Sequence, residues 1–335
     1  MDKFNTIKKD LSKFYNKDIT LNLSPASGYR SRCEFGFKNN QYTMMKAGKK
    51  IFFDSFNLPV SSIQDVMKPL LELICDNPQV KDKLFQVNFR SVESVVLVTL
   101  IYHKVLSDNW LKEANKIGSQ LNINIIGRSR NQMVNTDLIE LEEHVKIEPS
   151  FYLYQDDKTF YQPNAYLMPK MIECVQKLIK EPCDLLELYC GSGTFTIPLS
   201  FMFNDIFATE NNRSSIRYLK KSIKKSNITN IHHARLSDNE LTEAFNGKNF
   251  RRMADIDINV FNFSHVLVDP PRSGLNNNVT QILSKFNNII YISCNPSTFE
   301  RDLVSLKGYK IKKVEVFDQF SNTSHLELIA LLVKN

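Results

Sequence analysis

The sequence predicts two domains: a mixed α+β domain over residues 1–157 and an α/β domain with a doubly wound, mostly parallel sheet over residues 158–335. The chain has 335 residues, more than one average domain, and 42% of them are hydrophobic, enough to build two cores. Short β-like runs dominate the first half, whereas strand-like and helix-like runs alternate in the second half. Such alternation is typical of a parallel sheet with helices on both faces.

The elements expected in the first domain are short. Residues 85–89 alternate in polarity and residues 94–102 form an apolar β-type run, so both predict strands. Helices are expected at residues 60–76 and 111–121, and residues 122–127 follow the second helix as another β-type run. This mixture predicts an α+β domain.

A helix over residues 162–178 is expected to lead into the second domain. Strand-like runs follow it at residues 184–190, 205–210, within 228–236, 264–269, 287–293, 310–317 and 325–333. The last two runs leave no room for a helix between them, so they must be antiparallel. The second half therefore predicts a Rossmann-like, seven-stranded domain whose last strand is antiparallel.

Composition argues against several classes of protein. No apolar run reaches the length of a bilayer span, and no signal peptide is recognisable, so a cytoplasmic protein without membrane contact is expected. The six cysteines are scattered without a Cys-x-x-Cys pair, which argues against a zinc site, an iron–sulfur cluster and a disulfide framework. The net charge of +7 suits a polyanionic partner.

A glycine-containing turn follows the first strand of the second domain. Gly191 and Gly193 allow a tight turn, and Glu210 ends the next strand, where a carboxylate can accept hydrogen bonds from two ribose hydroxyls. A dinucleotide-binding turn needs a third glycine, but Thr196 occupies that position, so a nucleoside ligand such as S-adenosylmethionine is favoured. The alternative is a structural turn followed by a surface glutamate.

Three further side chains are expected to meet at the carboxyl edge of the sheet. Asp269 follows the fourth strand, Cys294 follows the fifth, and Glu327 opens the antiparallel last strand, whose beginning lies at the same edge. Asn295 and Pro296 are typical of a helix start. We therefore expect the N-terminus of this helix to lower the pKa of the Cys294 thiol.

The other cysteines lack such a context. A lone cysteine is more often an inert buried residue, and this interpretation applies to Cys33, Cys75, Cys174 and Cys183. Cys190 could line the cofactor pocket but has no activating neighbour. For Glu327, a surface ion pair is the alternative as long as only its sequence position is considered.

A thiol and a carboxylate at one edge suit a particular reaction. Carbon 5 of uracil is a poor nucleophile, but addition of a thiolate at carbon 6 turns carbon 5 into an enolate carbon that can attack an electrophilic methyl group. A base must then remove the proton on carbon 5 before the thiol is expelled. Covalent catalysis followed by general base catalysis would use Cys294 as the nucleophile and Glu327 as the base.

Several short motifs occur together along the chain. They are YRSRCEF from Tyr29, KLFQ from Lys83, IGR from Ile126, YQPN from Tyr161, LLELYCG from Leu185, VDPPRSGL from Val268, YISCNP from Tyr291 and FDQF from Phe317. With these motifs the chain resembles the bacterial tRNA (uracil-5-)-methyltransferase family over nearly its whole length. The combination is highly specific, although no single motif is.

The resemblance implies an S-adenosylmethionine-dependent methyltransferase domain preceded by an RNA-binding domain. It also implies that Cys294 is the nucleophile and Glu327 the proton acceptor. The S-adenosylmethionine-binding positions that it implies are Gln162, Tyr189, Thr194, Glu210 and Asp269. Thr194 departs from the asparagine that is common at its position, which leaves its side-chain contact open.

The product implied by the resemblance is 5-methyluridine at position 54, in the T-arm of tRNA. The tRNA-like loop of tmRNA is a second expected substrate. Related ribosomal RNA uridine methylases usually add an N-terminal β-barrel and a four-cysteine iron–sulfur site, and this sequence shows neither, which favours tRNA. We expect a monomer with no metal and no iron–sulfur cluster.

A uridine inside a folded loop must leave its stack to reach a thiol. The first domain is expected to hold the RNA by shape and stacking, with Arg30, Arg32 and Phe85 as candidates and Phe85 stacking on a displaced base. A plain core position is the alternative for Phe85. The basic residues between positions 213 and 224 share one helical face, which is either a solvated face or an extension of the RNA footprint.

Three other functions stay open at this stage. One is a nicotinamide-dependent oxidoreductase, which the missing third glycine argues against. Another is a non-catalytic RNA-folding factor on a methyltransferase scaffold, which the presence of both Cys294 and Glu327 argues against. The third is the same chemistry on 23S ribosomal RNA.

Overall fold

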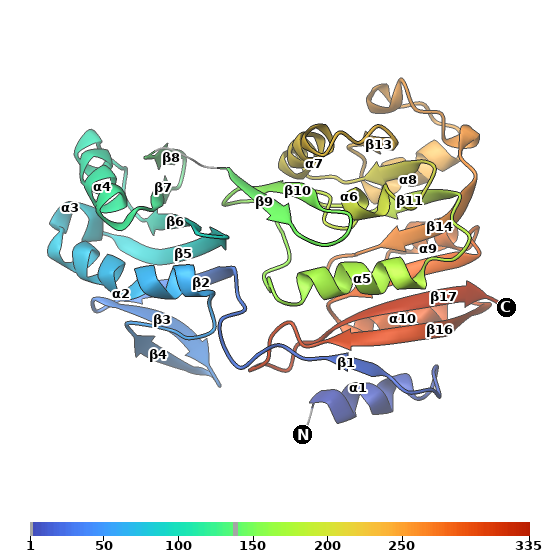
Figure 1. Cartoon of the computed structure of the whole chain (residues 1–335), viewed down its shortest axis with the longest axis horizontal. Helices are drawn as coiled ribbons and strands as arrows, with labels where there is room; N and C mark the ends of the chain where they lie inside the picture. The colour runs from blue at the N-terminus through green and yellow to red at the C-terminus, as the bar shows by residue number, and fades with distance from the viewer. Residues whose placement is uncertain (1–2, 137–139) are drawn as a thin grey trace.

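The computed structural model describes residues 3–136 and 140–335 of the chain (Figure 1). Two large sheets lie side by side, one of seven strands from the first half of the chain and one of eight strands built mainly from the second half. The carboxyl ends of the parallel strands in the eight-stranded sheet carry the side chains that matter most for function.

The eight-stranded sheet has the order β1-β16-β17-β15-β14-β11-β12-β13. Its main strands are β11 (Asp184–Leu188), β12 (Ile206–Thr209), β13 (Ile231–Ala234), β14 (Phe263–Val268), β15 (Asn288–Ser293), β16 (Tyr309–Phe317) and β17 (Glu327–Lys334). Strand β17 is antiparallel to both β15 and β16, whereas strands β11 to β15 pair in parallel. The predicted Rossmann-like domain, with seven strands and an antiparallel last strand, is confirmed.

Helices cover both faces of this sheet. They are α5 (Met168–Leu178), α6 (Thr196–Leu199), α7 (Arg213–Lys225), α8 (Asp238–Phe245), α9 (Asn277–Leu283) and α10 (Pro296–Ser305), with short 3₁₀ turns at η1 (Arg251–Met253) and η2 (Ile258–Val260). Successive strand side chains point to opposite faces. Leu186 and Leu188 therefore join the core under α9 and α10, whereas Leu185 joins the core under α5 and α7.

The sheet has an eighth strand that periodicity did not predict. Strand β1 (Thr20–Asn22) pairs in parallel with the outer edge of β16. Helix α1 (Lys3–Leu11), which precedes it, buries Ile7 and Leu11 in the core on the α9 and α10 side of the sheet. The start of the chain thus packs on the second half of the molecule, and Figure 1 shows it along the lower edge of the large sheet.

A hairpin before residue 157 also packs on the second half. Its strands are β9 (Leu141–Val145) and β10 (Phe151–Gln155), and Phe151 and Leu153 are buried in the core that α7 and α5 share. The backbone amide of Tyr154 donates to the Ser222 hydroxyl on α7, and that of Tyr152 donates to the hydroxyl of Ser226, directly after α7. The domain division at residue 157 stays a prediction.

The seven-stranded sheet has the order β4-β3-β2-β5-β6-β7-β8. Its elements are β2 (Arg32–Lys38), β3 (Gln41–Lys46), β4 (Lys49–Phe53), α2 (Ser61–Asp76), α3 (Pro78–Lys81), β5 (Leu84–Val92), β6 (Val95–Tyr102), α4 (Asp108–Leu121), β7 (Asn124–Ser129) and β8 (Gln132–Asn135). Only β6 and β7, joined through α4, pair in parallel, and the other pairs are antiparallel. The expected mixed α+β character is therefore present.

No helix within residues 3–136 and 140–335 is long and apolar enough to cross a membrane. All six cysteines have free thiols.

Candidate active site

A cavity of about 820 Å³ opens at the carboxyl ends of the parallel strands. Its lining comes from the loops after β11, β12, β13, β14 and β15, from the loop between β16 and β17, and from the segment before α5. Open α/β sheets bind ligands at this edge because successive loops diverge there. Of the site residues predicted from sequence, the lining includes Gln162, Tyr189, Glu210, Asp269, Cys294 and Glu327.

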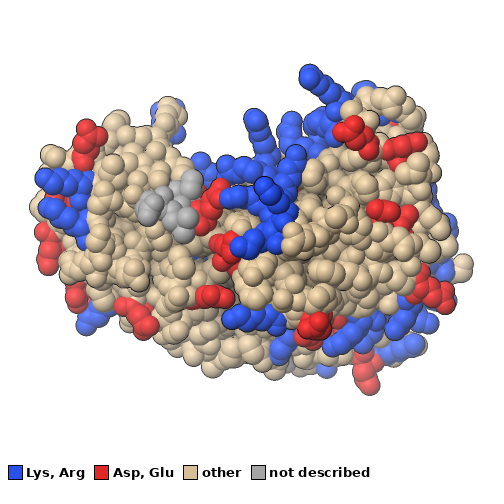
Figure 2. All heavy atoms as spheres, turned by 45° about the horizontal axis from the view of Figure 1, so that its top comes forward, with Lys and Arg blue, Asp and Glu red and all other residues tan. Residues whose placement is uncertain are grey.

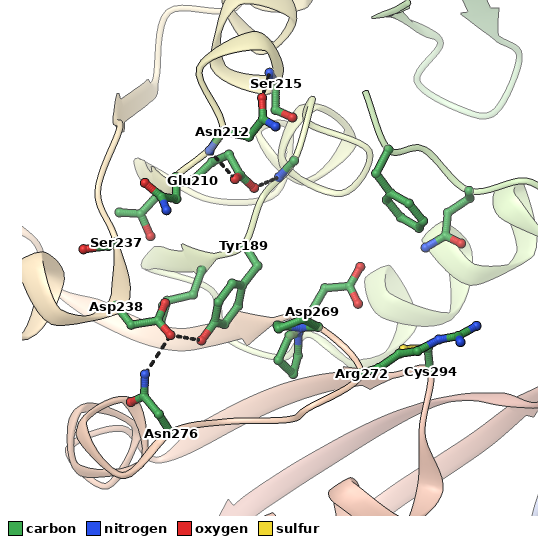
Figure 3. Close-up of a pocket in the computed structure, with 18 of the residues that line it drawn as sticks. Tyr189, Glu210, Asn212, Ser215, Ser237, Asp238, Asp269, Arg272, Asn276 and Cys294 are labelled. Atoms are coloured by element: carbon green, nitrogen blue, oxygen red, sulfur yellow. Dashed lines mark hydrogen bonds between the residues drawn. The ribbon is translucent and has the colours of Figure 1, made fainter. Parts of the chain in front are cut away.

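The glycine turn after β11 and Glu210 after β12 are hydrogen-bonded to each other at one end of the cavity. The Gly191 amide donates to Oε2 of Glu210 at 3.0 Å, and the Asn212 amide donates to Oε1 at 2.6 Å (Figure 3). Two hydrogen bonds leave acceptor positions free on the carboxylate. Gly193 has a φ of +99°, and a Cβ there would lie 2.7 Å from the Leu219 side chain, so glycine is required. The two amides thus fix the orientation of the carboxylate and leave acceptor positions for a ligand.

Two polar residues in this part of the cavity were not predicted from sequence. These two residues are Asp238 and Asn276. Oδ2 of Asp238 accepts from the Tyr189 hydroxyl at 2.9 Å and from the side-chain nitrogen of Asn276 at 2.8 Å (Figure 3). Asp238 is the first residue of α8, directly after Ser237, which forms a capping box with Glu240. The Ser-x-x-Glu signature after the third strand was the available signal, because it places a helix start at the ligand-binding edge.

Asp269 and Glu327 lie with Cys294 in the part of the cavity away from Glu210. In Figure 3 the Asp269 side chain lies between Tyr189 and Cys294. Burial raises the pKa of Asp269 to about 7. Burial, reinforced by the charge of Asp269, raises the pKa of Glu327 to about 8, although Gln319 and Arg272 oppose the shift. Both carboxyls can therefore exchange protons near neutral pH, which is what a catalytic base requires.

The expectation that a helix N-terminus lowers the pKa of the Cys294 thiol is wrong. Its pKa is raised, first by burial and then by Glu327 and Asp269, with Arg272 opposing. Asn295 is the N-cap of α10, and its side chain accepts from the Ser297 amide, so the helix end already has an acceptor. The sequence argument counted one favourable effect, whereas burial and the two carboxyls have larger effects.

Gln162 and Thr194 differ in their relation to the cavity. Gln162 is buried in the lining, and its Oε1 accepts a hydrogen bond from Nε2 of Gln319 at 3.3 Å. Thr194 is buried in the turn after Gly193 and is not among the described residues that line the cavity. The ligand roles of both residues stay predictions.

The three predicted RNA contacts are spread over the first half of the chain. The Arg30 guanidinium lies 5.2 Å from the ring centroid of Phe320, a residue of the cavity lining. Arg32 pairs with Glu34 on the same strand. Phe85 is half-buried and stacks on His103 with ring centroids 3.8 Å apart, so it is part of a surface ring pair rather than the core. Only Arg30 lies beside the cavity.

Basic side chains of α7 gather on the face of the molecule shown in Figure 2. Lys221 pairs with Glu140 and lies over the Tyr154 ring, and Lys225 pairs with Glu142. These contacts hold the β9–β10 hairpin on α7 and favour a structural role for this part of the helix face. Its other cations, among them Lys220 and Lys224, are exposed.

The residues of the cavity fit S-adenosylmethionine. A glycine turn, an adjoining carboxylate with free acceptor positions, and buried polar groups beyond it offer separate places for a nucleoside and for an amino acid moiety. Within the described parts of the chain, no group of three or more His, Cys, Asp or Glu side chains is arranged to hold a metal ion. The fold and this site define an S-adenosylmethionine-dependent methyltransferase of the Rossmann-like class.

Comparison with known proteins gives the family. The family described as "tRNA (Uracil-5-)-methyltransferase" matches residues 1–335. A tRNA/tmRNA (uracil-C(5))-methyltransferase of Campylobacter concisus is 40% identical over 339 residues, 98% of this chain and 92% of that protein. A protein of the same description from Saccharophagus degradans is 40% identical over 348 residues, 99% of this chain and 95% of that protein. The chain therefore belongs to the tRNA (uracil-5-)-methyltransferase family.

A solved structure agrees with the fold. The tRNA (uracil-54, C5)-methyltransferase of Pyrococcus abyssi, in complex with S-adenosyl-L-homocysteine, matches with a TM-score of 0.76 at 20% identity. The match covers 99% of this chain and 83% of that chain. The resemblance, the fold class and the enzyme class predicted from sequence are confirmed, and the oxidoreductase alternative is wrong. The roles of individual site residues stay predictions.

Proposed function

We propose that the protein transfers a methyl group from S-adenosylmethionine to carbon 5 of uridine 54 in the T-arm of tRNA, with the tRNA-like loop of tmRNA as a second substrate. The observation that carries this proposal is the convergence of Cys294, Asp269 and Glu327 on the cavity that also contains the Glu210 carboxylate. Relatives at 40% identity that share nearly the full length are described as acting on tRNA and tmRNA.

Cys294 and Glu327 divide the chemistry between them. The Cys294 sulfur adds to carbon 6 of the uracil, and the electron pair of the carbon 5–carbon 6 double bond moves toward carbon 5 and the adjacent carbonyl. When bound, S-adenosylmethionine supplies an electrophilic methyl group on a positively charged sulfur. Glu327 then takes the carbon 5 proton, the double bond re-forms, and the carbon–sulfur bond breaks to return the thiolate.

Charge near Asp269 and Glu327 affects both the addition of the Cys294 sulfur to carbon 6 and the removal of the carbon 5 proton. Their raised pKa values show that burial disfavours the carboxylate forms. A positive charge held nearby favours those forms and also favours the Cys294 thiolate, because opposite charges stabilise one another in a poorly solvated site. We infer that the catalytic groups become fully reactive only when the methyl donor is in place.

The methyl donor is proposed to be held by five residues, namely Gln162, Tyr189, Thr194, Glu210 and Asp269. Glu210 would accept hydrogen bonds from the ribose hydroxyls. We expect Glu210→Ala to weaken binding of S-adenosyl-L-homocysteine by roughly 2 kcal/mol, about thirty-fold, because charge-assisted hydrogen bonds are lost and the glycine turn loses its acceptor. Isothermal titration calorimetry measures this change.

The matched control for this prediction is Glu243→Ala. Glu243 is on α8, makes a surface ion pair with Lys248 at 2.7 Å, and does not line the cavity. Its replacement should leave the dissociation constant within about two-fold of the native value. Equal weakening by both variants would mean that Glu210 does not contact the ligand.

The RNA-facing residues remain Arg30, Arg32 and Phe85, and Arg30 has the strongest structural support because it lies against Phe320 at the cavity. Phe85 and His103 present a stacked ring pair that a displaced base could extend. Cytoplasmic location and a monomeric state are part of the proposal and rest on the expectations from sequence.

The substrate is tested with radiolabelled-methyl S-adenosylmethionine and three unmodified transcripts: a tRNA, a tmRNA fragment and 23S ribosomal RNA. We expect label in tRNA and tmRNA, and nuclease mapping should place it on the T-loop uridine. Label confined to ribosomal RNA would keep the chemistry and overturn the substrate. Binding of the methyl donor without transfer to any RNA would favour a non-catalytic RNA-folding factor.

A further inference from the structure

Gln319 lies beside the proposed base but has no role in the chemistry described so far. It belongs to the loop between β16 and β17 and is completely buried. Its Nε2 lies 3.3 Å from Oε2 of Glu327 and 3.3 Å from Oε1 of Gln162. The same nitrogen lies 2.7 Å from the sulfur of Met171. One amide therefore joins the base to a proposed cofactor-binding residue.

The backbone around Gln319 is anchored from segments far apart in the sequence. Asp318 forms an ion pair with Lys3 of α1 at 2.6 Å, and its carbonyl accepts from the Ser24 hydroxyl at 2.6 Å. The Gln319 carbonyl accepts from the Asn164 side chain at 3.3 Å. These contacts anchor the backbone of the loop beside β17, and the three contacts of Nε2 hold the buried side chain against Glu327.

Four groups act on the Glu327 carboxyl, two from the loop after β14, one from the loop after β15 and one from the loop between β16 and β17. Asp269, after β14, disfavours its negative charge, and Cys294, after β15, does the same as a thiolate. Arg272 and Gln319 favour the negative charge, and of the two only Gln319 is within hydrogen-bond distance. The amide thus offsets part of the electrostatic cost of a buried carboxylate.

The other end of the amide is also informative. Oε1 of Gln319 is buried and has no hydrogen-bond partner among the described residues. An unsatisfied buried acceptor is costly, so a donor is expected there during part of the reaction cycle. A protonated Glu327 is such a donor, since half a turn of the amide brings Oε1 to the carboxyl. The Gln162 amide would turn with it, so that its nitrogen rather than its oxygen faces Oε1 of Gln319. One side chain can therefore bond either protonation state of the base.

We propose that Gln319 is a positioning residue for the proton-removal step, donating to Glu327 while it is a carboxylate and accepting from it once it is protonated. The proposal rests on the proposed function. In that step the carbon 5–hydrogen bond breaks and the proton passes to Glu327. The freed electron pair forms the carbon 5–carbon 6 double bond, and the carbon–sulfur pair returns to Cys294 as a thiolate.

Gln319→Met tests the proposal, because methionine keeps the length of the side chain and removes the amide. The substrate is tRNA carrying tritium on carbon 5 of the T-loop uridine. Methyl transfer and tritium release are followed in single turnovers between pH 6 and 9. In the native protein the two should coincide. In the variant, tritium release should lag about ten-fold at pH 7, and a covalent protein–RNA species should accumulate.

The pH dependence separates a positioning role from a structural one. Loss of the amide raises the pKa of Glu327, because its hydrogen bond to the carboxylate is stronger than its hydrogen bond to the neutral acid. The rising limb of tritium release should therefore move about one unit toward alkaline pH, and the lag should shrink to about two-fold at pH 9. A deficit of equal size at every pH would mean that Gln319 is only structural, and the proposal would be wrong. Gln319→Glu places a second acid beside the base and should move the limb further.

The chain offers a matched control in Gln155→Met. Gln155 is also buried, and its Nε2 donates at 3.1 Å to Oε2 of Glu143, a carboxyl whose pKa is raised to about 7 by burial and Glu93, outside the cavity lining. This variant should lose stability without changing the pH limb. Thermal unfolding of all variants checks folding. Native protein that fails to methylate tRNA overturns the proposed function, whereas native activity with an unmoved limb in Gln319→Met overturns only this inference.

Discussion

Cys294→Ala is expected to abolish methyl transfer to tRNA, lowering the single-turnover rate by roughly four orders of magnitude. Without the thiolate, carbon 5 of uracil keeps its poor nucleophilicity, and no other described cysteine lines the cavity. Binding of the methyl donor should change little, because Glu210 and the glycine turn lie at the other end of the cavity (Figure 3). Rapid-quench assays with radiolabelled methyl donor measure the rate.

Transcripts that contain 5-fluorouridine test the covalent step directly. Fluorine on carbon 5 cannot leave as a proton, so the native enzyme should remain joined to the RNA through the sulfur of Cys294 and migrate as a complex on a denaturing gel. Cys294→Ala should form no such complex. Cys183→Ala is the control, since Cys183 is also partly exposed but lies before β11, outside the cavity lining. A persistent complex in Cys294→Ala would assign the nucleophile elsewhere.

The parts of the fold predicted from sequence are those specified by local patterns. Apolar runs such as β11 and β15 are buried along their length, and the alternation with helices places their carboxyl ends at one edge. This is why Asp269 and Cys294 could be expected to meet in space. The Glu210 prediction also depended on local features, a glycine turn and the end of the next strand, and the two hydrogen bonds to its carboxylate explain that pattern.

Features that depend on distant pairings could not be predicted in this way. Strand β1 has three residues and pairs with β16, almost 300 residues later, so no periodicity reveals it. Gln319 becomes notable only once β17 places Glu327 beside it. The pKa of Cys294 depends on burial and on two carboxyls from other loops, which is why a helix-based argument gave the wrong direction. Each failure involves a contact between elements rather than a preference within one.

Glu327→Gln is expected to trap the covalent intermediate, whereas Cys294→Ala is expected to prevent its formation. The amide cannot accept the carbon 5 proton, so one methyl group should transfer and the methylated uridine should stay bonded to Cys294. Turnover should fall by about three orders of magnitude, within the range that a general base contributes. The measurement is a denaturing gel of the variant with RNA that contains ordinary uridine. We expect a protein–RNA complex that carries the methyl label.

The pH dependence of the native enzyme follows from the same residue. Proton removal needs the carboxylate, and burial raises the pKa of Glu327 to about 8, so this step should accelerate as pH rises toward 8 and level off above it. A bound positive charge lowers that midpoint. In Glu327→Gln the rising limb of proton removal should vanish, because the residue whose titration governs this step is gone.

The two substitutions are most informative together. Both variants should be inactive in multiple turnover, but Cys294→Ala should leave the RNA unmodified and free, whereas Glu327→Gln should leave it methylated and bound. Glu300→Gln is the control for the second variant, since Glu300 is on α10 and pairs only weakly with Lys13, 3.8 Å away at the surface. If Glu327→Gln released methylated RNA at the native rate, another acceptor would take the proton, and Asp269, the other acid whose pKa burial raises in this cavity, would be the next residue to replace.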